Sequence, residues 1–418
     1  MYAIALQSPY SSHFGAQPPS LPYAKVLLYP MSLGIYIQVP FCQTRCTYCN
    51  FHTGVVSSAR FAPYAAAVQT EIREHQSRLQ QAGIVLPNSL AQEMTDTVYF
   101  GGGTPSLLDP EHLRGMLAAI RDTFVHDFRE VTLEADPETI DSQKAAGWAA
   151  AGINRVSLGV QSFSDLELRA AGRMHRRTDI YRVVPILHAA GIRNISFDLI
   201  AGLPHQTPES WRNSLDELIQ LAPQHVSIYL LEVDQGSRLG SELLRGGAKY
   251  SASAVPSDDA MAESYDLART TLSAAGYEHY EISNFAKPGF ASEHNRKYWC
   301  RAPYLGFGAG AHSFSGTQRW ANAHDAAAYV QSVASGKIPI EQAETISAPQ
   351  ALEEELFLGL RQLAGIDLDR LQRFYGVSIS DRFQPLESSG LLERDGTVVR
   401  LAAKHLSISN EVFVELMR

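Results

Sequence analysis

Apolar and polar positions alternate along the chain in two recurring patterns from Gly34 onward. Short runs of apolar, β-branched residues predict buried strands at residues 35–39, 97–100, 130–133, 155–159, 195–200 and 226–231. Longer stretches between them predict helices at residues 61–80, 110–124, 141–151, 165–171, 178–190 and 208–220. Asp141 and Thr207 mark helix starts, and Gly152 and Gly191 mark helix ends. Strand–helix units in succession predict a parallel sheet with right-handed crossovers.

Six such units are fewer than the eight that close a TIM barrel, so the sequence predicts an α/β fold with an open, partial (βα)6 barrel of the TIM type. We expect this barrel to occupy residues 34–245. Residues 246–348 are expected to extend it as a looser region, with a helix at 258–275 and a Gly- and aromatic-rich stretch up to Phe314.

The tail of the chain, residues 349–418, changes character. It predicts helices at residues 351–361, 367–375 and 380–388, followed by a pair of strands around Asp395 and Gly396. Three helices and a hairpin in this order are typical of a winged-helix-like domain.

The first residues, 1–33, are predicted to be an extension outside the barrel. They are rich in Ser, Pro and Tyr, with no basic start and no continuous apolar core, which is a poor match to a signal peptide. Met31 directly precedes the first convincing strand. We therefore expect either that Met31 is the natural start or that residues 1–30 form a loose extension.

Composition narrows the class of protein. Hydrophobic residues make up 45% of the chain and charged residues 19%, which excludes a disordered chain. A net charge of −9 excludes a general nucleic-acid binder, which would carry a basic excess. No apolar run reaches the roughly 18 residues that a membrane-spanning helix needs. Four cysteines in 418 residues do not make a secreted disulfide scaffold, so we expect a cytoplasmic protein.

Three of the four cysteines stand together as C-x3-C-x2-C, at Cys42, Cys46 and Cys49, directly after the first predicted strand. Clustered cysteines in a reducing compartment indicate metal or redox chemistry. Three thiolates on one loop suit a 4Fe–4S cluster that keeps one iron open for a small ligand. Structural zinc usually takes four protein ligands, and His52 is available as a fourth, so a zinc site is the alternative.

Polar residues gather where later strands are predicted to end. Gly101 to Thr104 follow the second strand, and glycines there let backbone amides approach a small polar group, although an ordinary turn is equally compatible. Glu134 and Asp136 end the third strand. The carboxyl ends of barrel strands form the active face, which favours ligand contact for Glu134, whereas Asp136 before Pro137 also fits a helix cap.

The cysteine motif, with Tyr48 before its third cysteine and a GGGTP loop after the second strand, resembles radical S-adenosylmethionine (SAM) enzymes. In that family the open iron binds SAM and the reduced cluster cleaves it. From Gly34 to the C-terminus the chain is similar to the branch that contains anaerobic coproporphyrinogen oxidases. This resemblance implies that SAM is contacted by Tyr36, Tyr48, Gly102, Gly103, Thr104, Glu134, Gln161, Arg173 and Asp198.

Two features separate the members of this branch. The true oxygen-independent coproporphyrinogen III oxidase has a further cysteine at the position of Phe51. The hexapeptide His294-Asn-Arg-Lys-Tyr-Trp299 and the segment 304–313 resemble the HemW-type haem chaperones. Histidine is a good axial ligand of haem iron, aromatic rings suit a porphyrin face, and the Gly-rich strand is expected to let a flat ligand approach closely.

His294 is accordingly the predicted haem ligand, although a surface histidine bonded to nearby backbone is the alternative. His312 is expected either as a second ligand or as a residue lining the SAM pocket near the cluster. Cys300 is expected to be an inert buried thiol, with ligation of haem or the cluster as the other interpretation.

The resemblance therefore implies a haem chaperone with a 4Fe–4S cluster, SAM and haem, and without coproporphyrinogen oxidase activity. Its partners would be haem-accepting proteins such as respiratory enzymes, and an electron donor such as flavodoxin, ferredoxin or an NADH-linked reductase. Any membrane contact is expected through those partners. The alternatives are a coproporphyrinogen III oxidase of porphyrin biosynthesis, for which Arg173 and Lys297 offer basic groups, and a zinc-stabilised scaffold.

Overall fold

The computed structural model describes residues 32–51, 53–87 and 92–417. Two expectations fall on other residues and lie outside this range: the start at Met31 with its preceding extension, and the use of His52 as a zinc ligand. The domain boundaries expected within the range stay a prediction.

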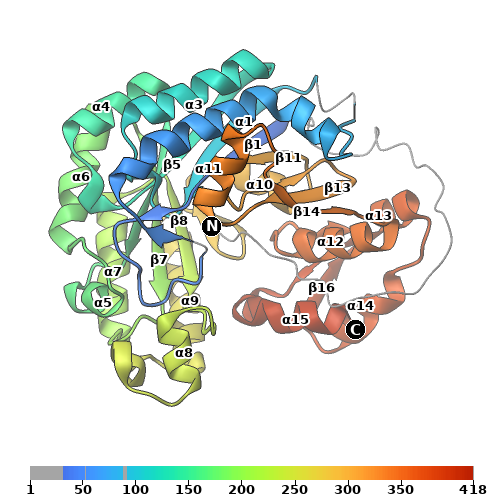
Figure 1. Ribbon diagram of the computed structural model, residues 1–418. Coiled ribbons are helices and arrows are strands. Elements are labelled where there is room, and N and C mark those ends of the chain that lie inside the picture. The colour runs from blue at the N-terminus through green and yellow to red at the C-terminus, as the bar shows by residue number, and fades with distance from the viewer. Residues whose placement is uncertain (1–31, 52, 88–91, 418) are drawn as a thin grey trace.

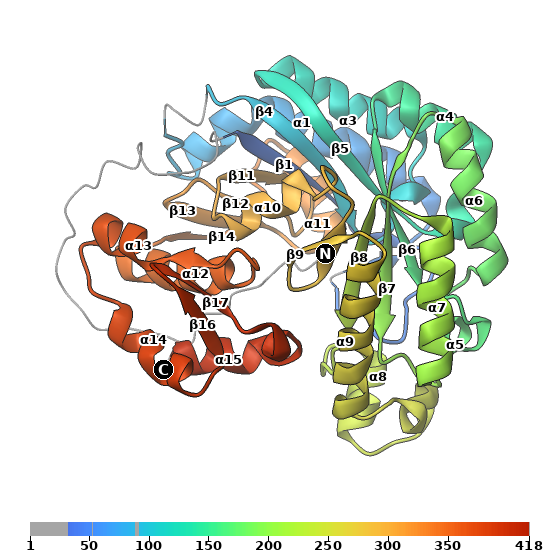
Figure 2. The same ribbon diagram turned by 180° about the vertical axis from the view of Figure 1, so that it is seen from behind.

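A parallel sheet forms the barrel and confirms the predicted fold class. Its strands are neighbours in chain order (Figures 1 and 2). They are β1 (Leu33–Val39), β4 (Thr95–Gly102), β5 (His126–Ala135), β6 (Arg155–Gln161), β7 (Asn194–Ala201) and β8 (His225–Leu230). The helices that follow them are α1 (Phe61–Gln81), α3 (Pro110–Thr123), α4 (Ser142–Ala151), α5 (Asp165–Ala170), α6 (Arg177–Ala189) and α7 (Pro208–Leu221). Each predicted strand and helix is present, with ends that differ by a few residues.

Side chains along a barrel strand point alternately into the apolar core and into the interior of the barrel. In β4, Val98 and Phe100 are completely buried in the main apolar cluster, which also contains Leu117 of α3. Thr97 and Tyr99, on the other face of the same strand, instead contact polar groups inside the barrel. The local signals act as expected at helix ends, since Asp141 accepts a hydrogen bond from the Lys144 amide at the start of α4.

The region expected to be loose is part of the sheet. On one side of β1 lie β11 (Tyr304–Phe307), β12 (His312–Phe314), β13 (Gln318–Asn322) and β14 (Ile340–Thr345), and beyond β8 lie β10 (Asn284–Ala286) and β9 (Glu278–Glu281). The helices of this region are α9 (Asp258–Ala274), α10 (Glu293–Trp299) and α11 (Ala326–Ala334), and α8 (Arg238–Leu244) directly precedes it. These strands are three to six residues long, too short for a clear alternation in the sequence.

The C-terminal domain has the predicted winged-helix-like arrangement. It contains α12 (Ala348–Leu360), β15 (Ile366–Asp367), α13 (Leu368–Tyr375), α14 (Ser380–Ser388), β16 (Leu392–Asp395), β17 (Val398–Leu401) and α15 (Ser409–Leu416). The three strands form one small antiparallel sheet, and α12 lies beside β14 in both views (Figures 1 and 2). The sequence pattern missed β15 and α15.

The C-terminal domain contacts the segment that extends the barrel, residues 246–348. The Arg361 guanidinium lies 4.5 Å from the centre of the Trp299 ring, and Glu281 forms an isolated β-bridge with Gln362. The end of α10 is thereby held between the barrel and the C-terminal domain. As for membrane association, no helix among the described residues has the length and apolar character that a crossing requires.

Candidate cofactor site

A single cavity at the carboxyl ends of the barrel strands gathers most of the predicted site residues. Among those that line it are Cys42, Cys46, Tyr48, Cys49, Gly102, Gly103, Thr104, Glu134, Gln161, Arg173 and Asp198. They come from the cysteine loop and from the ends of β4 to β7, which are far apart in the sequence. The cavity is therefore assembled by the parallel strand order, as the barrel rule predicts.

The cysteine loop presents all three thiols to this cavity. The loop begins at β2 (Phe41–Cys42), which pairs with β3 (Gly54–Val55), and the Thr47 amide donates to the Ala171 carbonyl at 3.0 Å. The three cysteines are free thiols, and burial raises the pKa of Cys42 and Cys49. Soft sulfur donors on one anchored loop fit an iron–sulfur cluster.

A single-ion site is not formed by the residues that the structure describes. No three His, Cys, Asp or Glu side chains in that part of the chain converge as they would around one metal ion. A 4Fe–4S cluster takes its thiolates on separate irons, so its ligands surround a larger volume than the ligands of one ion.

The glycine loop lies directly against the cysteine loop. A Cβ atom on Gly103 would lie 2.5 Å from the Phe41 carbonyl oxygen and 2.9 Å from Cys42 Sγ, so only glycine fits there. The Gly103 amide donates to the Val39 carbonyl at 2.8 Å, and the Thr104 amide donates to the Phe41 carbonyl at 2.6 Å. The glycine loop therefore fixes the distance between the ends of β1 and β4. The Gly103 and Thr104 amides already have acceptors within the chain.

Two carboxylates face the cavity with part of their hydrogen-bonding capacity in use. Glu134 accepts from the Tyr99 hydroxyl at 2.9 Å and from the Gly102 amide at 3.0 Å. Both oxygens of Asp198 accept from the Ser157 hydroxyl, at 3.2 and 3.0 Å. Burial raises the pKa of Glu134. A carboxylate oxygen accepts more than one hydrogen bond, so both groups can still receive ammonium or hydroxyl donors of a ligand.

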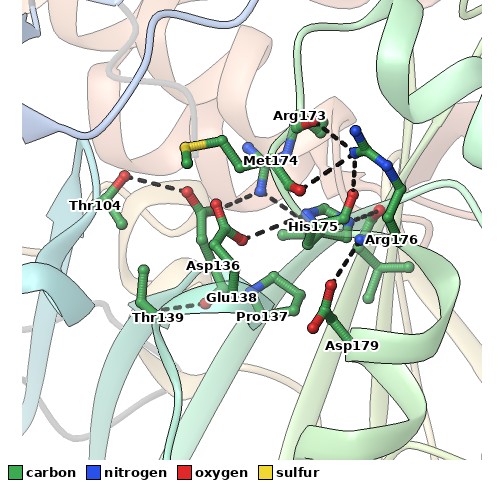
Figure 3. A network of polar contacts seen from close by, with 12 residues as sticks. Thr104, Asp136, Pro137, Glu138, Thr139, Arg173, Met174, His175, Arg176 and Asp179 are labelled. Atoms are coloured by element: carbon green, nitrogen blue, oxygen red, sulfur yellow. Dashed lines mark hydrogen bonds and ion pairs between the residues drawn. The ribbon is translucent and has the colours of Figure 1, made fainter.

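Arg173 joins three parts of the site, and Figure 3 shows its contact with Asp136. Its guanidinium pairs with Asp136, donates to the Gly159 carbonyl at 2.9 Å and reaches Cys46 Sγ at 3.5 Å. Thr104 donates its hydroxyl to the second oxygen of Asp136 at 3.3 Å. Arg173 thus ties the cysteine loop to the ends of β5 and β6.

Asp136 is the site residue that sequence reasoning left undecided. It precedes a short 3-10 turn, Pro137–Thr139, but its side chain makes no capping hydrogen bond. Its carboxylate lines the cavity and pairs with Arg173 instead. The helix-cap interpretation is therefore wrong, and its position two residues after Glu134 at a strand end was the signal in the sequence.

An apolar wall completes the cavity and was not predicted. It includes Ile200 of β7, Tyr229 of β8 and Leu231 just after β8, together with Met174. Phe51, at the position that distinguishes the oxidase, lines the same cavity and is 39% exposed. An aromatic ring therefore stands where a further cysteine would face the site.

Two residues implied by the resemblance lie outside this cavity. Tyr36 stands in β1, donates to Gln38 at 2.8 Å and stacks on Tyr99 with ring centres 6.1 Å apart. His312 stands in β12, with its ring centre 6.5 Å from that of His324. Neither lines the cavity that the other predicted SAM contacts share.

His294 lies at the opposite end of the barrel from the cysteine loop. It is 1% exposed, and its two ring nitrogens are 2.9 Å from the hydroxyls of Thr97, near the start of β4, and of Tyr298. Burial lowers the pKa of His294 to about 3, so the imidazole is neutral. The alternative of a surface histidine is wrong, while its role as a haem ligand stays a prediction.

The surroundings of α10 are closely packed. Lys297 forms an ion pair with Asp96 at 2.8 Å, and the Cys300 thiol lies 3.9 Å from Gln362. A Cβ atom on Gly306 would lie 2.1 Å from the His312 carbonyl oxygen. At Gly306, the Gly-rich strand serves close packing within the chain, which corrects the expectation that it opens toward a flat ligand.

Comparison with known families agrees with this architecture. Residues 36–218 match the model of the Radical SAM superfamily, and residues 346–404 match the HemN C-terminal domain. The solved coproporphyrinogen III oxidase (HemN) of Escherichia coli has the same fold, with a TM-score of 0.77 over 93% of this chain and 91% of that one, at 22% identity. The fold and the cysteine site thus define a radical SAM protein with a HemN-type C-terminal domain.

Curated relatives give the narrower assignment. The chain is 32% identical to Heme chaperone HemW of Bacillus subtilis, over 90% of this chain and 97% of that protein. It is 33% identical to Heme chaperone HemW of Mycobacterium tuberculosis, over 92% of this chain and 94% of that protein. It also resembles mitochondrial radical S-adenosyl methionine domain-containing protein 1 of Mus musculus, at 31% identity over 92% of this chain and 87% of that protein. The chain belongs to the HemW family of the radical SAM superfamily, whose membership implies a 4Fe–4S cluster and SAM.

Proposed function

We propose that this chain is a haem chaperone, which binds a 4Fe–4S cluster, SAM and haem and delivers haem to haem proteins. The observation that carries the proposal is its likeness, along nearly its whole length, to relatives named Heme chaperone HemW. The hexapeptide from His294 to Trp299 and the aromatic residue at Phe51 support the same assignment.

Cys42, Cys46 and Cys49 would hold the cluster, since they are free thiols on one loop that faces one cavity. When bound, a reduced cluster supplies one electron to the sulfonium group of SAM. Glu134 and Asp198 would accept hydrogen bonds from SAM, and the apolar wall with Ile200 would exclude water from its ring system. Arg173 would hold Cys46 in place by its hydrogen bond to sulfur.

Haem would bind at α10, where His294 would hold its iron. The imidazole is neutral and so carries a lone pair, but both nitrogens now meet hydroxyl groups. Ligation therefore requires that one nitrogen exchange its hydroxyl partner for iron. Of the two partners, Tyr298 lies on α10 itself, whereas Thr97 is fixed in a central strand, so the Tyr298 hydrogen bond is the one we expect to break.

The partners in this proposal are haem-accepting proteins, such as respiratory enzymes, and an electron donor such as flavodoxin, ferredoxin or an NADH-linked reductase. Capture experiments on the loaded protein, followed by identification of the bound proteins, test both classes of partner.

The test combines haem titration with a turnover assay on anaerobically purified protein. The wild type should contain iron and sulfide, retain a sharp Soret band after desalting, and leave coproporphyrinogen III unchanged. His294→Ala should lower haem affinity at least about tenfold. His75→Ala is the matched control, because His75 is also a buried, hydrogen-bonded histidine but lies on α1.

Three outcomes would overturn parts of this proposal. Conversion of coproporphyrinogen to protoporphyrinogen without haem retention would support the oxidase instead. A colourless protein that contains zinc would support the zinc-stabilised scaffold. Equal haem affinity in wild type and His294→Ala would remove His294 from the haem site while leaving the chaperone function intact.

A further inference from the structure

The end of β6 departs from regular strand geometry where it borders the cavity. Its pairing with β7 shifts register between Leu158 and Gln161, and Gln161 has a φ of 61°. The Ser162 amide donates to the Val160 carbonyl at 2.7 Å, across this one residue. A hydrogen bond across a single residue with positive φ forms a strained γ-turn, which persists only where the surrounding groups hold it. The residue at the centre of this turn, Gln161, lines the cavity.

His175 holds the carbonyl that closes the turn. Its side chain is fully buried, and its Nε2 lies 3.0 Å from the Val160 carbonyl oxygen. A carbonyl oxygen can only accept, so Nε2 carries a hydrogen and donates it. The same oxygen has two lone pairs, which the Ser162 amide and the His175 ring share. The imidazole therefore fixes one end of the γ-turn.

The other side of the His175 ring faces residues that follow β5. Its Nδ1 lies 3.6 Å from Glu138 Oε2, and Figure 3 shows the Glu138 side chain directed toward the ring. Two residues earlier in each segment, Asp136 pairs with Arg173, which also donates to the Gly159 carbonyl at 2.9 Å. Arg173 and His175 thus contact two acidic side chains at the end of β5 and two consecutive carbonyls at the end of β6.

The Gln161 side chain lies among these contacts but is not used by them. A Cβ atom on Gly159 would lie 3.0 Å from Gln161 Nε2 and 2.9 Å from Arg173 Nη2, so the Gln161 amide occupies space that a side chain would fill. After the turn, Ser162 donates its hydroxyl to the buried Glu167 carboxylate at 2.7 Å, which anchors the second end. Among the described residues the Gln161 amide has no hydrogen-bond partner, so it is available to a ligand in the cavity.

We propose that His175 is a positioning residue for SAM binding: it holds the γ-turn at residues 160–162 and thereby directs the Gln161 amide toward the polar groups of SAM. This inference rests on the proposed function, in which SAM occupies the cavity. His175 does not line the cavity, so it acts through Gln161 and not by contact with the ligand. A side chain that is held in place before binding loses less conformational entropy when the ligand arrives, which raises affinity.

The first experiment measures SAM affinity by equilibrium dialysis on the cluster-loaded protein. His175→Phe keeps a buried ring but removes the donor to Val160, and it should weaken SAM binding about fivefold or more. His175→Gln places an amide nitrogen at the level of Nε2 and should stay within about twofold of the wild type. Equal SAM affinity in the wild type and His175→Phe would overturn the inference.

The matched control is His75→Phe. His75 is also a buried histidine whose ring bonds a backbone carbonyl, that of Ile72 at 2.9 Å, but it lies on α1 and does not line the SAM cavity. His75→Phe should therefore keep the SAM affinity of the wild type. A loss as large as that in His175→Phe would show that removing any buried histidine weakens SAM binding, which would also overturn the inference.

A double variant tests whether His175 acts through Gln161. Gln161→Ala should itself weaken SAM binding. Adding His175→Phe to it should change the affinity by less than about twofold, because the side chain that His175 positions is gone. If the two losses multiply instead, His175 affects SAM binding independently of Gln161, and the inference is wrong.

A measurement without ligand keeps the inference separate from the proposed function. In protein labelled with nitrogen-15 at glutamine side chains, the Gln161 amide signal is assigned with Gln161→Ala. This signal should shift in His175→Phe and return toward its wild-type position in His175→Gln. A signal that stays in place in His175→Phe overturns the inference and leaves the chaperone proposal standing. Wild-type protein that binds no SAM would overturn the proposed function and the ligand named here, whereas the amide signal still tests the positioning.

Folding of each variant is checked by its unfolding temperature. If His175→Phe does not fold, His175→Asn takes its place, since the shorter amide lies at the level of Nδ1 and does not reach the Val160 carbonyl. His175→Asn should show the same loss of SAM affinity relative to His175→Gln. Wild-type affinity in His175→Asn would contradict the role of this hydrogen bond and overturn the inference.

Discussion

The backbone N–H of His294 donates to the carboxylate of Glu130 at 3.2 Å, across a separation of 164 residues in the chain. The same carboxylate accepts from the Ser292 hydroxyl at 3.1 Å and from the Glu293 amide at 3.0 Å. A negative charge at a helix N-terminus is favourable, since the first amides there have no partner within the helix. The orientation of α10 is therefore set by a residue of β5.

Removing this carboxylate should destabilise the fold and disturb the haem site. Glu130→Ala should lower the free energy of unfolding by about 3 kcal/mol, because three donors lose their acceptor and the buried Arg155 loses an opposite charge. The loss is measured by urea unfolding, with haem affinity as a second readout. Glu278→Ala is the control, since Glu278 is the exposed first residue of β9, and it should change stability by less than about 0.5 kcal/mol. Equal losses in the two variants would show that Glu130 does not cap α10.

The pairing of Arg173 with Asp136 should hold the cysteine loop in place. Arg173→Gln is expected to cost about 2–3 kcal/mol, less than a fully buried pair, because the Asp136 side chain is 22% exposed. The variant should also lose iron, since the hydrogen bond to Cys46 is removed. Stability is measured by denaturant unfolding and iron by metal analysis of oxygen-free protein.

A double variant separates the contribution of the ion pair from the individual contributions of Arg173 and Asp136. Arg173→Gln with Asp136→Asn should be more stable than Arg173→Gln alone, because the uncompensated carboxylate is gone. Arg177→Gln is the surface control, since the Arg177 side chain is 49% exposed in its pair with Glu217 and exposed pairs contribute less than about 1 kcal/mol. A loss in Arg177→Gln as large as in Arg173→Gln would contradict this account.

Gly103 lies where the glycine loop contacts the cysteine loop, so the addition of a single methyl group there should disturb the site. Gly103→Ala should cost about 1–3 kcal/mol and displace the cysteine loop, because the added atom would overlap the Phe41 carbonyl and approach Cys42 Sγ. The expected result is a protein that loses most of its iron. Gly54→Ala is the matched control near the same loop, since its nearest neighbour would be 3.9 Å away. Full iron content in Gly103→Ala would disprove the close-packing argument.

A buried acid beneath the Gly-rich segment should make stability depend on pH. Glu71 accepts from the Gly308 amide, Tyr329 hydroxyl and Asn322 amide at 2.9, 2.5 and 2.6 Å, and burial raises its pKa from 4.5 to about 7. Between these values the folded state holds a proton that the unfolded chain releases. The contribution of Glu71 to stability is therefore complete below pH 4.5 and is lost as the pH rises to about 7.

The comparison is between wild type and Glu71→Gln, which carries no titrating group at this position. From pH 5 to pH 8, the free energy of unfolding of the wild type should fall by up to about 3 kcal/mol relative to the variant. Urea unfolding at several pH values gives this difference directly. A difference between the two proteins that stays constant over this range would mean that Glu71 titrates normally.

Local patterns in the sequence predicted the barrel and much of the site. The strands that became β1 and β4 to β8 contain short runs of apolar, β-branched residues, and such runs are visible without any tertiary information. Cys42, Cys46 and Cys49 lie within eight positions, so their shared chemistry could be inferred from spacing alone. The strand-end rule then brought Glu134 and Asp198 to the same cavity.

Other features depended on contacts between distant segments. The strands β9 to β14 carry too few residues for a periodic pattern, and only their hydrogen bonds to the barrel edges define them. The role of Asp136 was open because a carboxylate before Pro137 suits a helix cap as well as an ion pair, and Arg173 decides between them.

The sequence by itself determined the order of strands and helices, the cysteine site and the family, because these depend on local periodicity and short spacings. Only the tertiary structure decided that His294 is buried at the far end of the barrel from the cysteines, and that Tyr99 and Glu130 contact it there. The physical reason is that burial and hydrogen-bond partners arise from segments more than a hundred residues apart, and no local pattern encodes which of them meet.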